Sequence, residues 1–214
     1  MHYIIDNKVI KSELAAKSTK QTNSHMLQII DELPSGLTVL DYGCGKLRYS
    51  IPLASKAKTV IAIDSSFQIE KKQIVNGMKM TIRDYDQSNL YVYDINSEIW
   101  RKHTYDLVFC INVLSAVPCD MERRNILTNA YAVLKNGGFV LIAVQYRNSY
   151  YNQYSKRSDT IRFHDGWLIK RKENMYSFYG IPSEEKVVEM CINVGFNEVN
   201  THRLNGSYYI KAYK

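Results

Sequence analysis

Short, nearly uninterrupted apolar segments recur along this 214-residue chain and alternate with helical patterns. A strand that is apolar on both faces belongs in a parallel sheet, because helices cover such a sheet on both sides. The expected strands lie at 38–43, 59–64, 90–95, 105–112 and 139–144, and the expected helices at 24–32, 46–55, 65–76, 120–134 and 183–194. The sequence therefore predicts an α/β fold with a doubly wound, mostly parallel sheet.

The end of the chain departs from this alternation. Two strand-like segments, Glu198–Leu204 and Tyr208–Tyr213, flank the dipeptide Asn205-Gly206. Asn-Gly between two such segments favours a tight hairpin, because both residues readily adopt the left-handed backbone that the turn needs. We therefore expect the last strand to run antiparallel to its neighbour.

The length suits a single domain over residues 1–214. We expect an N-terminal helical extension at 1–36, and we interpret the segment at about 146–182, which has no clean periodicity, as a functional insertion. No apolar run approaches the roughly 20 residues of a membrane span, so we expect a cytoplasmic protein without a membrane partner. The four cysteines are widely spaced and indicate neither a disulfide framework nor a metal site.

A glycine-containing turn follows the first expected strand and is the main candidate for a ligand site. Gly43 and Gly45 allow a tight turn that a ligand can approach closely, and Asp64 ends the next strand, where a carboxylate can accept hydrogen bonds from ribose hydroxyls. The alternative is a purely structural turn. Asp41 would repel a pyrophosphate, but it suits a ligand that carries an ammonium group, such as S-adenosylmethionine.

In sequence order, this turn and four later segments resemble class I S-adenosylmethionine-dependent methyltransferases. The matching segments are Val39–Gly45, Val60–Asp64, Val92–Ile95, Tyr105–Pro118 and Val133–Ile142. The similarity covers about residues 24–145 by motif and 183–214 by topology. It implies a Rossmann-like fold with seven strands, an antiparallel C-terminal hairpin strand, and S-adenosylmethionine as the cofactor.

The resemblance also implies which residues bind the cofactor. They are Asp41, Gly43, Cys44, Gly45, Asp64, Ser65, Asp94, Ile95 and Asn112. The chain departs from the family at Leu47, where many members have a third glycine, and at Ser115 and Ala116, where many have histidines. The second departure removes a familiar candidate base, and the sequence assigns no catalytic residue.

The insertion gives the main indication of the methyl acceptor, because basic and aromatic residues alternate along it. The candidate acceptor-binding residues are Arg147, Tyr150, Tyr151, Arg157, Trp167 and Arg171. Arginine and lysine side chains can bind phosphates, and aromatic rings can stack on unpaired nucleobases. An RNA acceptor is therefore the leading hypothesis, in keeping with the net charge of +7. The overall layout also loosely resembles transfer-RNA wobble-uridine methyltransferases.

Two alternatives remain open. The aromatic residues could pack a small core of the insertion, which would suit a small-metabolite acceptor. A binding module that retains the fold without turnover is the third reading, and the presence of Asp41 and Gly43 argues against it. Pro118-Cys119 resembles a nucleophile motif of cytosine methyltransferases, but it lies several residues beyond the strand, and we expect an ordinary loop. A lone histidine such as His164 is more often structural than a base.

Overall fold

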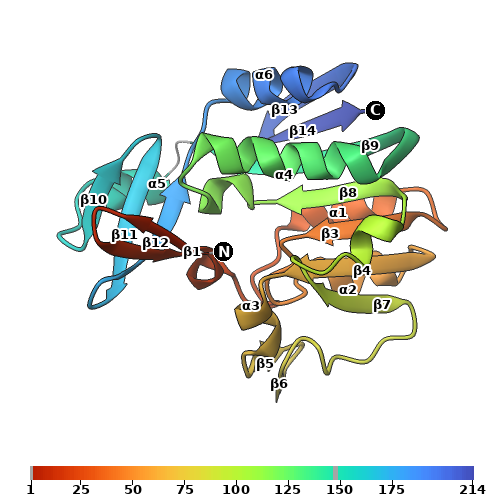
Figure 1. Cartoon of the computed structure of the whole chain (residues 1–214), viewed down its shortest axis with the longest axis horizontal. Coiled ribbons are helices and arrows are strands. Elements are labelled where there is room, and N and C mark those ends of the chain that lie inside the picture. Colours follow the sequence, from red (N-terminus) through yellow and green to blue (C-terminus); the bar gives the residue numbers. More distant parts are fainter. Residues whose placement is uncertain (1, 147–148) are drawn as a thin grey trace. The chain divides into compact units, whose positions relative to one another are not determined.

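The computed structural model describes the backbone of residues 2–146 and 149–214 and the side chains of 3–146 and 151–214. Its largest sheet has seven strands in the order β13-β14-β9-β8-β3-β4-β7 (Figure 1). They are β3 (Thr38–Tyr42), β4 (Thr59–Asp64), β7 (Leu90–Asp94), β8 (Tyr105–Ile111), β9 (Leu134–Gln145), β13 (Glu198–Leu204) and β14 (Ser207–Tyr213). β3 pairs in parallel with β4 and β8, and β4 with β7, whereas β13 and β14 are antiparallel. The predicted fold class is confirmed.

Helices connect most of these strands. They are α1 (Ser24–Glu32), α2 (Ser50–Ala54), α3 (Ser66–Glu70), α4 (Asp120–Val133), α5 (Ser149–Tyr154) and α6 (Glu184–Val194), with 3₁₀ turns at Ser12–Ala15, Trp100–Lys102 and Leu114–Ala116. Side chains cap several of them: the Asn23 side chain accepts a hydrogen bond from the His25 amide at the start of α1. Gly195, with a φ of +117°, ends α6 in the left-handed conformation that favours glycine.

The chain forms two compact units, each assembled from segments distant in sequence. One comprises residues 16–109 and 133–139, and the other comprises residues 2–15, 110–132, 140–146 and 149–214. The prediction of one domain over 1–214 stays a prediction. We call them the turn unit and the insertion unit, after the glycine turn and the insertion that they contain.

The core of the turn unit is formed by the apolar strands. Val60, Ala62 and Ile63 on β4 are fully buried, as expected for a strand covered on both faces. Helix α2 contacts β4 and β7, and α1 packs against α2. This arrangement holds the carboxyl ends of β3, β4 and β7 side by side, where ligands bind in open α/β sheets.

The segment after α3 differs from its prediction. The helix expected over 65–76 ends at Glu70 and is followed by a hairpin of β5 (Gln73–Val75) and β6 (Met78–Met80). Asn76 and Gly77 form its turn with φ values of 45° and 87°. The Asn-Gly turn signal is therefore stronger here than the helical pattern.

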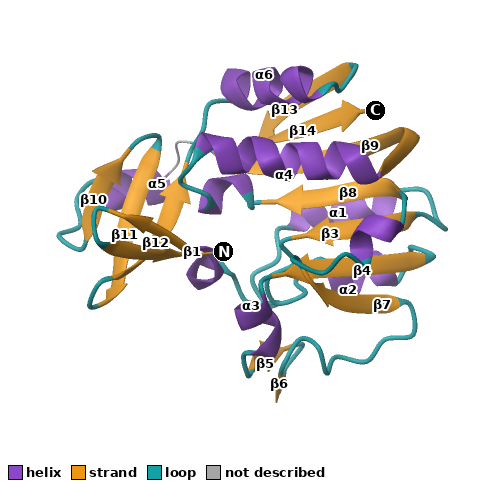
Figure 2. Cartoon of the chain, viewed as in Figure 1, coloured by secondary structure: helices purple, strands orange, loops and turns teal. Residues whose placement is uncertain are grey.

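The insertion unit contains a second sheet with five strands in the order β1-β2-β12-β11-β10 (Figure 2). They are β1 (His2–Ile5), β2 (Lys8–Lys11), β10 (Thr160–Phe163), β11 (Gly166–Lys172) and β12 (Met175–Gly180). The extension expected to be helical over 1–36 therefore starts with two strands, joined at Asp6 and Asn7 by a turn with positive φ values. The insertion is mainly a meander of strands, and β2 pairs in parallel with its last strand.

Candidate functional site

The glycine turn of the turn unit packs against the end of the neighbouring strand. Gly43 and Gly45 have φ values of 73° and 60°, which L side chains rarely adopt. The amides of Gly43 and Cys44 donate hydrogen bonds of 2.8 and 3.0 Å to the Ile63 carbonyl oxygen. A Cβ atom added at Gly45 would lie 3.4 Å from the Ala16 Cβ. The turn is therefore tight, and Ala16 packs against it at Gly45.

Two carboxylates from the ends of adjacent strands lie beside this turn. Asp64 and Asp94 are register partners in the β4–β7 pair. Asp64 accepts hydrogen bonds from the Gly45 amide through Oδ2 at 2.8 Å and from the Ser65 amide through Oδ1 at 2.7 Å. The Ile95 amide donates to the Asp64 carbonyl oxygen at 2.8 Å. The structure thus brings together the predicted strand-end residues of this unit, with the Asp64 carboxylate held in a fixed orientation.

Asp41 is buried at the end of β3, with 4% of its surface exposed. The pKa of this carboxyl is raised to about 7, chiefly by burial and also by the Asp64 charge, while the hydrogen bond from the Ser50 hydroxyl and the Arg48 charge oppose the rise. The Ser50 hydroxyl donates a hydrogen bond of 2.5 Å to Asp41 Oδ2. Sequence analysis missed Ser50, because no motif links it to a carboxylate nine residues earlier.

Leu47 and Gln68 support the turn from behind. Leu47 is fully buried with a φ of 61°, a left-handed conformation at the position where many family members have glycine. Gln68 Nε2 donates hydrogen bonds to the Gly45 carbonyl oxygen at 2.6 Å and to Gln73 Oε1 at 2.9 Å. The β5–β6 hairpin is therefore tied to the glycine turn through two buried glutamine side chains.

These groups fit a ligand that has hydroxyl and ammonium groups but no phosphate. The side chains at the strand ends are carboxylates, which accept hydrogen bonds and attract cations. Phosphate sites instead present backbone amides and basic side chains. The Gly45 amide is already bonded to Asp64. The donor set therefore suits S-adenosylmethionine better than a dinucleotide.

Asn112, the remaining predicted cofactor residue, belongs to the insertion unit. Its φ is 61°, and its amide donates to the Ala143 carbonyl oxygen at 2.8 Å. Gln145 Nε2 donates to Asn112 Oδ1 at 2.5 Å, and the Tyr179 hydroxyl lies 3.5 Å from Gln145 Oε1. These contacts link the end of β8 to strand β12 of the insertion. Sequence analysis did not identify Gln145 or Tyr179.

The predicted acceptor-side residues that the structure describes form contacts within the insertion. The Tyr151 and Trp167 rings meet edge to face with centroids 6.1 Å apart, and Arg162 lies over both rings. Arg157 forms an ion pair with Asp159. Arg171 Nε donates to the Ser177 hydroxyl at 2.8 Å. Arg147 and the side chain of Tyr150 lie outside the described residues.

Cys119 and His164 line one surface pocket of the insertion unit, with a volume of about 480 Å³. The His164 ring packs on Phe163 with centroids 4.2 Å apart. Behind the pocket, the buried Arg123 guanidinium forms ion pairs with Asp165 and Asp120 and donates to the Leu114 carbonyl oxygen. No activating contact between Cys119 and a base is found among the described residues.

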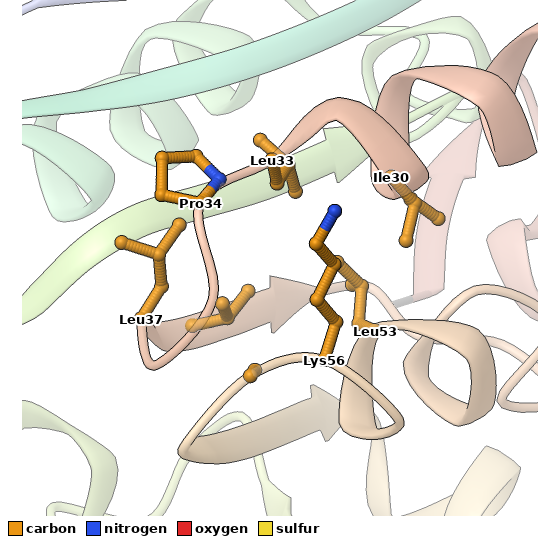
Figure 3. Close-up of a pocket in the computed structure, with 8 residues that line it drawn as sticks. Ile30, Leu33, Pro34, Leu37, Leu53 and Lys56 are labelled. Atoms are coloured by element: carbon orange, nitrogen blue, oxygen red, sulfur yellow. The ribbon is translucent and has the colours of Figure 1, made fainter.

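A second, smaller hollow lies between α1 and α2 (Figure 3). Apolar side chains surround it, including Ile30, Leu33, Leu37 and Leu53. Leu37 precedes β3, so the hollow lies at the opposite end of that strand from the glycine turn. It is a packing defect of the core rather than part of the ligand site.

Among the residues that the structure describes, no group of His, Cys, Asp or Glu side chains could hold a metal ion. No helix in that part of the chain is long and apolar enough to cross a membrane.

Comparison with known proteins gives consistent matches. The family described as "Methyltransferase domain" matches residues 16–199. "Uncharacterized protein YmfD" of Escherichia coli is 34% identical over 216 residues, covering 98% of this chain and 95% of that protein. "Ubiquinone biosynthesis O-methyltransferase" of Nitrosomonas europaea is 28% identical over 135 residues, or 62% of this chain and 55% of that protein. The crystal structure of a SAM-dependent methyltransferase from Methanosarcina mazei has the same fold, with a TM-score of 0.63, 22% identity, and coverage of 87% and 96%.

Proposed function

We propose that this chain, which belongs to the methyltransferase domain family and depends on S-adenosylmethionine, methylates a small-molecule acceptor. When bound, the cofactor supplies a methyl group carried on a sulfonium. Much of the rate of such a displacement can come from holding the acceptor in line with that methyl group. The protein therefore acts mainly by binding and orientation.

We propose that the strand-end residues of the turn unit hold the cofactor. Asp64, fixed by the Gly45 and Ser65 amides, accepts hydrogen bonds from the ribose hydroxyls. Asp94 and Ile95 meet the adenine, and Asp41 favours the ammonium end of the methionine part through its charge. The backbone of Gly43 and Cys44 allows the close approach.

We favour a small-molecule acceptor because the candidate acceptor-binding residues already have partners within the insertion. Arg157 and Arg171 already have partners in Asp159 and Ser177. The Tyr151 ring already contacts Trp167. A phosphate or a base would have to displace these contacts, whereas a small acceptor would not. The similarity to a ubiquinone biosynthesis O-methyltransferase supports the same choice.

RNA remains the second candidate, and two observations favour it. The chain carries a net charge of +7. Lys156, Lys170 and Lys172 of the insertion are exposed, and none of them forms an ion pair within the part of the chain that the structure describes. These lysines could still attract phosphates.

Transfer of labelled methyl groups tests the proposal. Purified protein and cofactor labelled on the methyl group would be incubated with a small-molecule extract and, separately, with total RNA. We expect label in the small-molecule fraction, with Asp64→Ala as the control that reduces turnover in either case. Label in RNA alone, with an affinity that falls by about 0.7 log units per log unit of salt for each phosphate contacted, would overturn the small-molecule assignment. Cofactor binding without turnover on either fraction would favour a binding module.

A further inference from the structure

The β5–β6 hairpin carries an exposed apolar surface. Ile74 and Met78 are 50% and 53% exposed, and Phe67 on the adjoining α3 is 46% exposed. In Figure 1 the hairpin extends from α3, away from β4 and β7 of the same unit. Exposed apolar side chains that gather within one short segment are more informative than the same residues scattered singly.

Lysines surround this apolar surface. Lys71 and Lys72 precede β5, and Lys79 is the register partner of Ile74. The nearby Glu70 is already paired with Arg83 at 2.6 Å, so it does not neutralise them. Asp84 and Asp86 follow in the next loop, so residues 66–86 carry four basic and three acidic side chains. The hairpin therefore combines an apolar tip with a small excess of positive charge.

One face of the hairpin is anchored at Gln73 and Val75, which are buried, and Gln73 Nε2 donates to the Gln68 carbonyl oxygen at 3.0 Å. Gln68 in turn donates to the Gly45 carbonyl oxygen. Ile74 and Lys79 pair across the hairpin and point to the opposite face, whereas Met78 pairs with Val75 and lies on the anchored face, next to the turn. The exposed tip, with Ile74 on one face and Met78 on the other, is thus held on a support that is continuous with the glycine turn.

We propose that the β5–β6 hairpin, with Phe67, is a docking surface for an anionic lipid bilayer. Aliphatic side chains flanked by lysines suit an interface in which the apolar groups enter the acyl boundary and the ammonium groups meet lipid phosphates. Single-stranded nucleic acid is bound mainly by platforms of several aromatic rings, whereas the proposed surface has one aromatic side chain, Phe67, together with the apolar Ile74 and Met78. The expectation of no membrane partner rested on the absence of a spanning segment, which does not bear on a peripheral surface.

Docking through this hairpin would bring the glycine turn near the bilayer. Helix α3 directly follows β4, and Gln68 on α3 donates a hydrogen bond to the Gly45 carbonyl oxygen of the turn. Binding of the turn unit to a bilayer would be independent of which acceptor the enzyme methylates.

Vesicle co-sedimentation of the full chain tests the proposal. We expect binding to vesicles of phosphatidylglycerol and phosphatidylcholine at low salt, and little binding to phosphatidylcholine alone. Lys72→Gln and Lys79→Gln should each weaken binding by about fivefold. Ile74→Ser combined with Met78→Ser should weaken it further, because apolar insertion is lost.

Matched controls separate a docking surface from general charge and stickiness. Ile192→Ser removes a 57% exposed isoleucine from α6, and Lys58→Gln removes an exposed lysine elsewhere in the turn unit. Both controls should bind the anionic vesicles as the parent does, and thermal unfolding should show that every variant is folded. Absence of binding to anionic vesicles, or equal losses in hairpin and control variants, would overturn the proposal. The proposal would also be overturned if the hairpin lysine variants weakened transfer-RNA binding but left vesicle binding unchanged.

Discussion

Replacing Asp41 by asparagine should stabilise the cofactor-free protein at neutral and higher pH. Burial raises the pKa of this carboxyl from its ordinary value of 3.8 to about 7. The folded protein therefore keeps the proton over a range in which the unfolded chain has lost it. Stability from this group is fully present below pH 3.8 and is lost as the pH rises through about 7.

The size of the effect follows from the pKa difference. A pKa rise from 3.8 to about 7 corresponds to about 4 kcal/mol of unfolding free energy, at about 1.4 kcal/mol per pKa unit. Asparagine has nearly the same shape and is neutral at every pH, and it can keep a hydrogen bond with the Ser50 hydroxyl. Asp41→Asn should therefore be more stable than the parent by up to about 4 kcal/mol at pH 8, and the gap should close towards pH 4.

Urea unfolding of both proteins from pH 4 to pH 8 measures this difference directly. Subtracting the two curves removes the contribution of the other titrating groups, such as Asp106 and Glu184, whose pKa values ion pairs and hydrogen bonds lower. The same variant should bind S-adenosylmethionine more weakly, because the cofactor's ammonium group would favour a charged carboxylate. A difference in stability that stays constant over this pH range would refute the reasoning.

Three further predictions concern single side chains. Asp64→Ala should lower cofactor affinity by about 1.5–3 kcal/mol for each hydrogen bond lost, and titration calorimetry of a folded variant that binds as tightly as the parent would contradict this. Arg123→Ala should destabilise the fold by about 3–5 kcal/mol, because the partly buried Asp165 carboxylate would lose the partner that bonds both of its oxygens and would keep Lys186 at 3.9 Å; chemical denaturation measures the loss, and the exposed Arg124→Ala should change little. Cys119→Ser should retain methyl transfer, and a variant that binds cofactor but has no turnover would show that the thiol is a nucleophile.

Local sequence signals predicted the parts of the fold that depend on neighbouring residues. Buried strands such as β4 have an apolar run, here Val60–Ile63, and Asn205-Gly206 specified the terminal hairpin. The same dipeptide at Asn76-Gly77 was overlooked, because the polar segment before it continues a helical pattern from Ser65.

Contacts between distant segments could not be predicted in this way. Strand β2 finds its partner in β12, where Ile10 lies opposite Tyr176. The buried Arg123 has one of its ion-pair partners in Asp165, 42 residues later. The glycine turn and its acids were predicted as one site, because strand ends in a parallel sheet must meet. The hydroxyl of Ser50 beside Asp41 carries no comparable signal.

The pairing of β2 with β12 also sets an order of events during synthesis. The β1–β2 hairpin is synthesised before its parallel partner at Met175 and Tyr176. At roughly 5–20 residues per second, the nascent hairpin waits on the order of ten seconds or more. During that time the edge of β2 that later pairs with β12 is open to other partners.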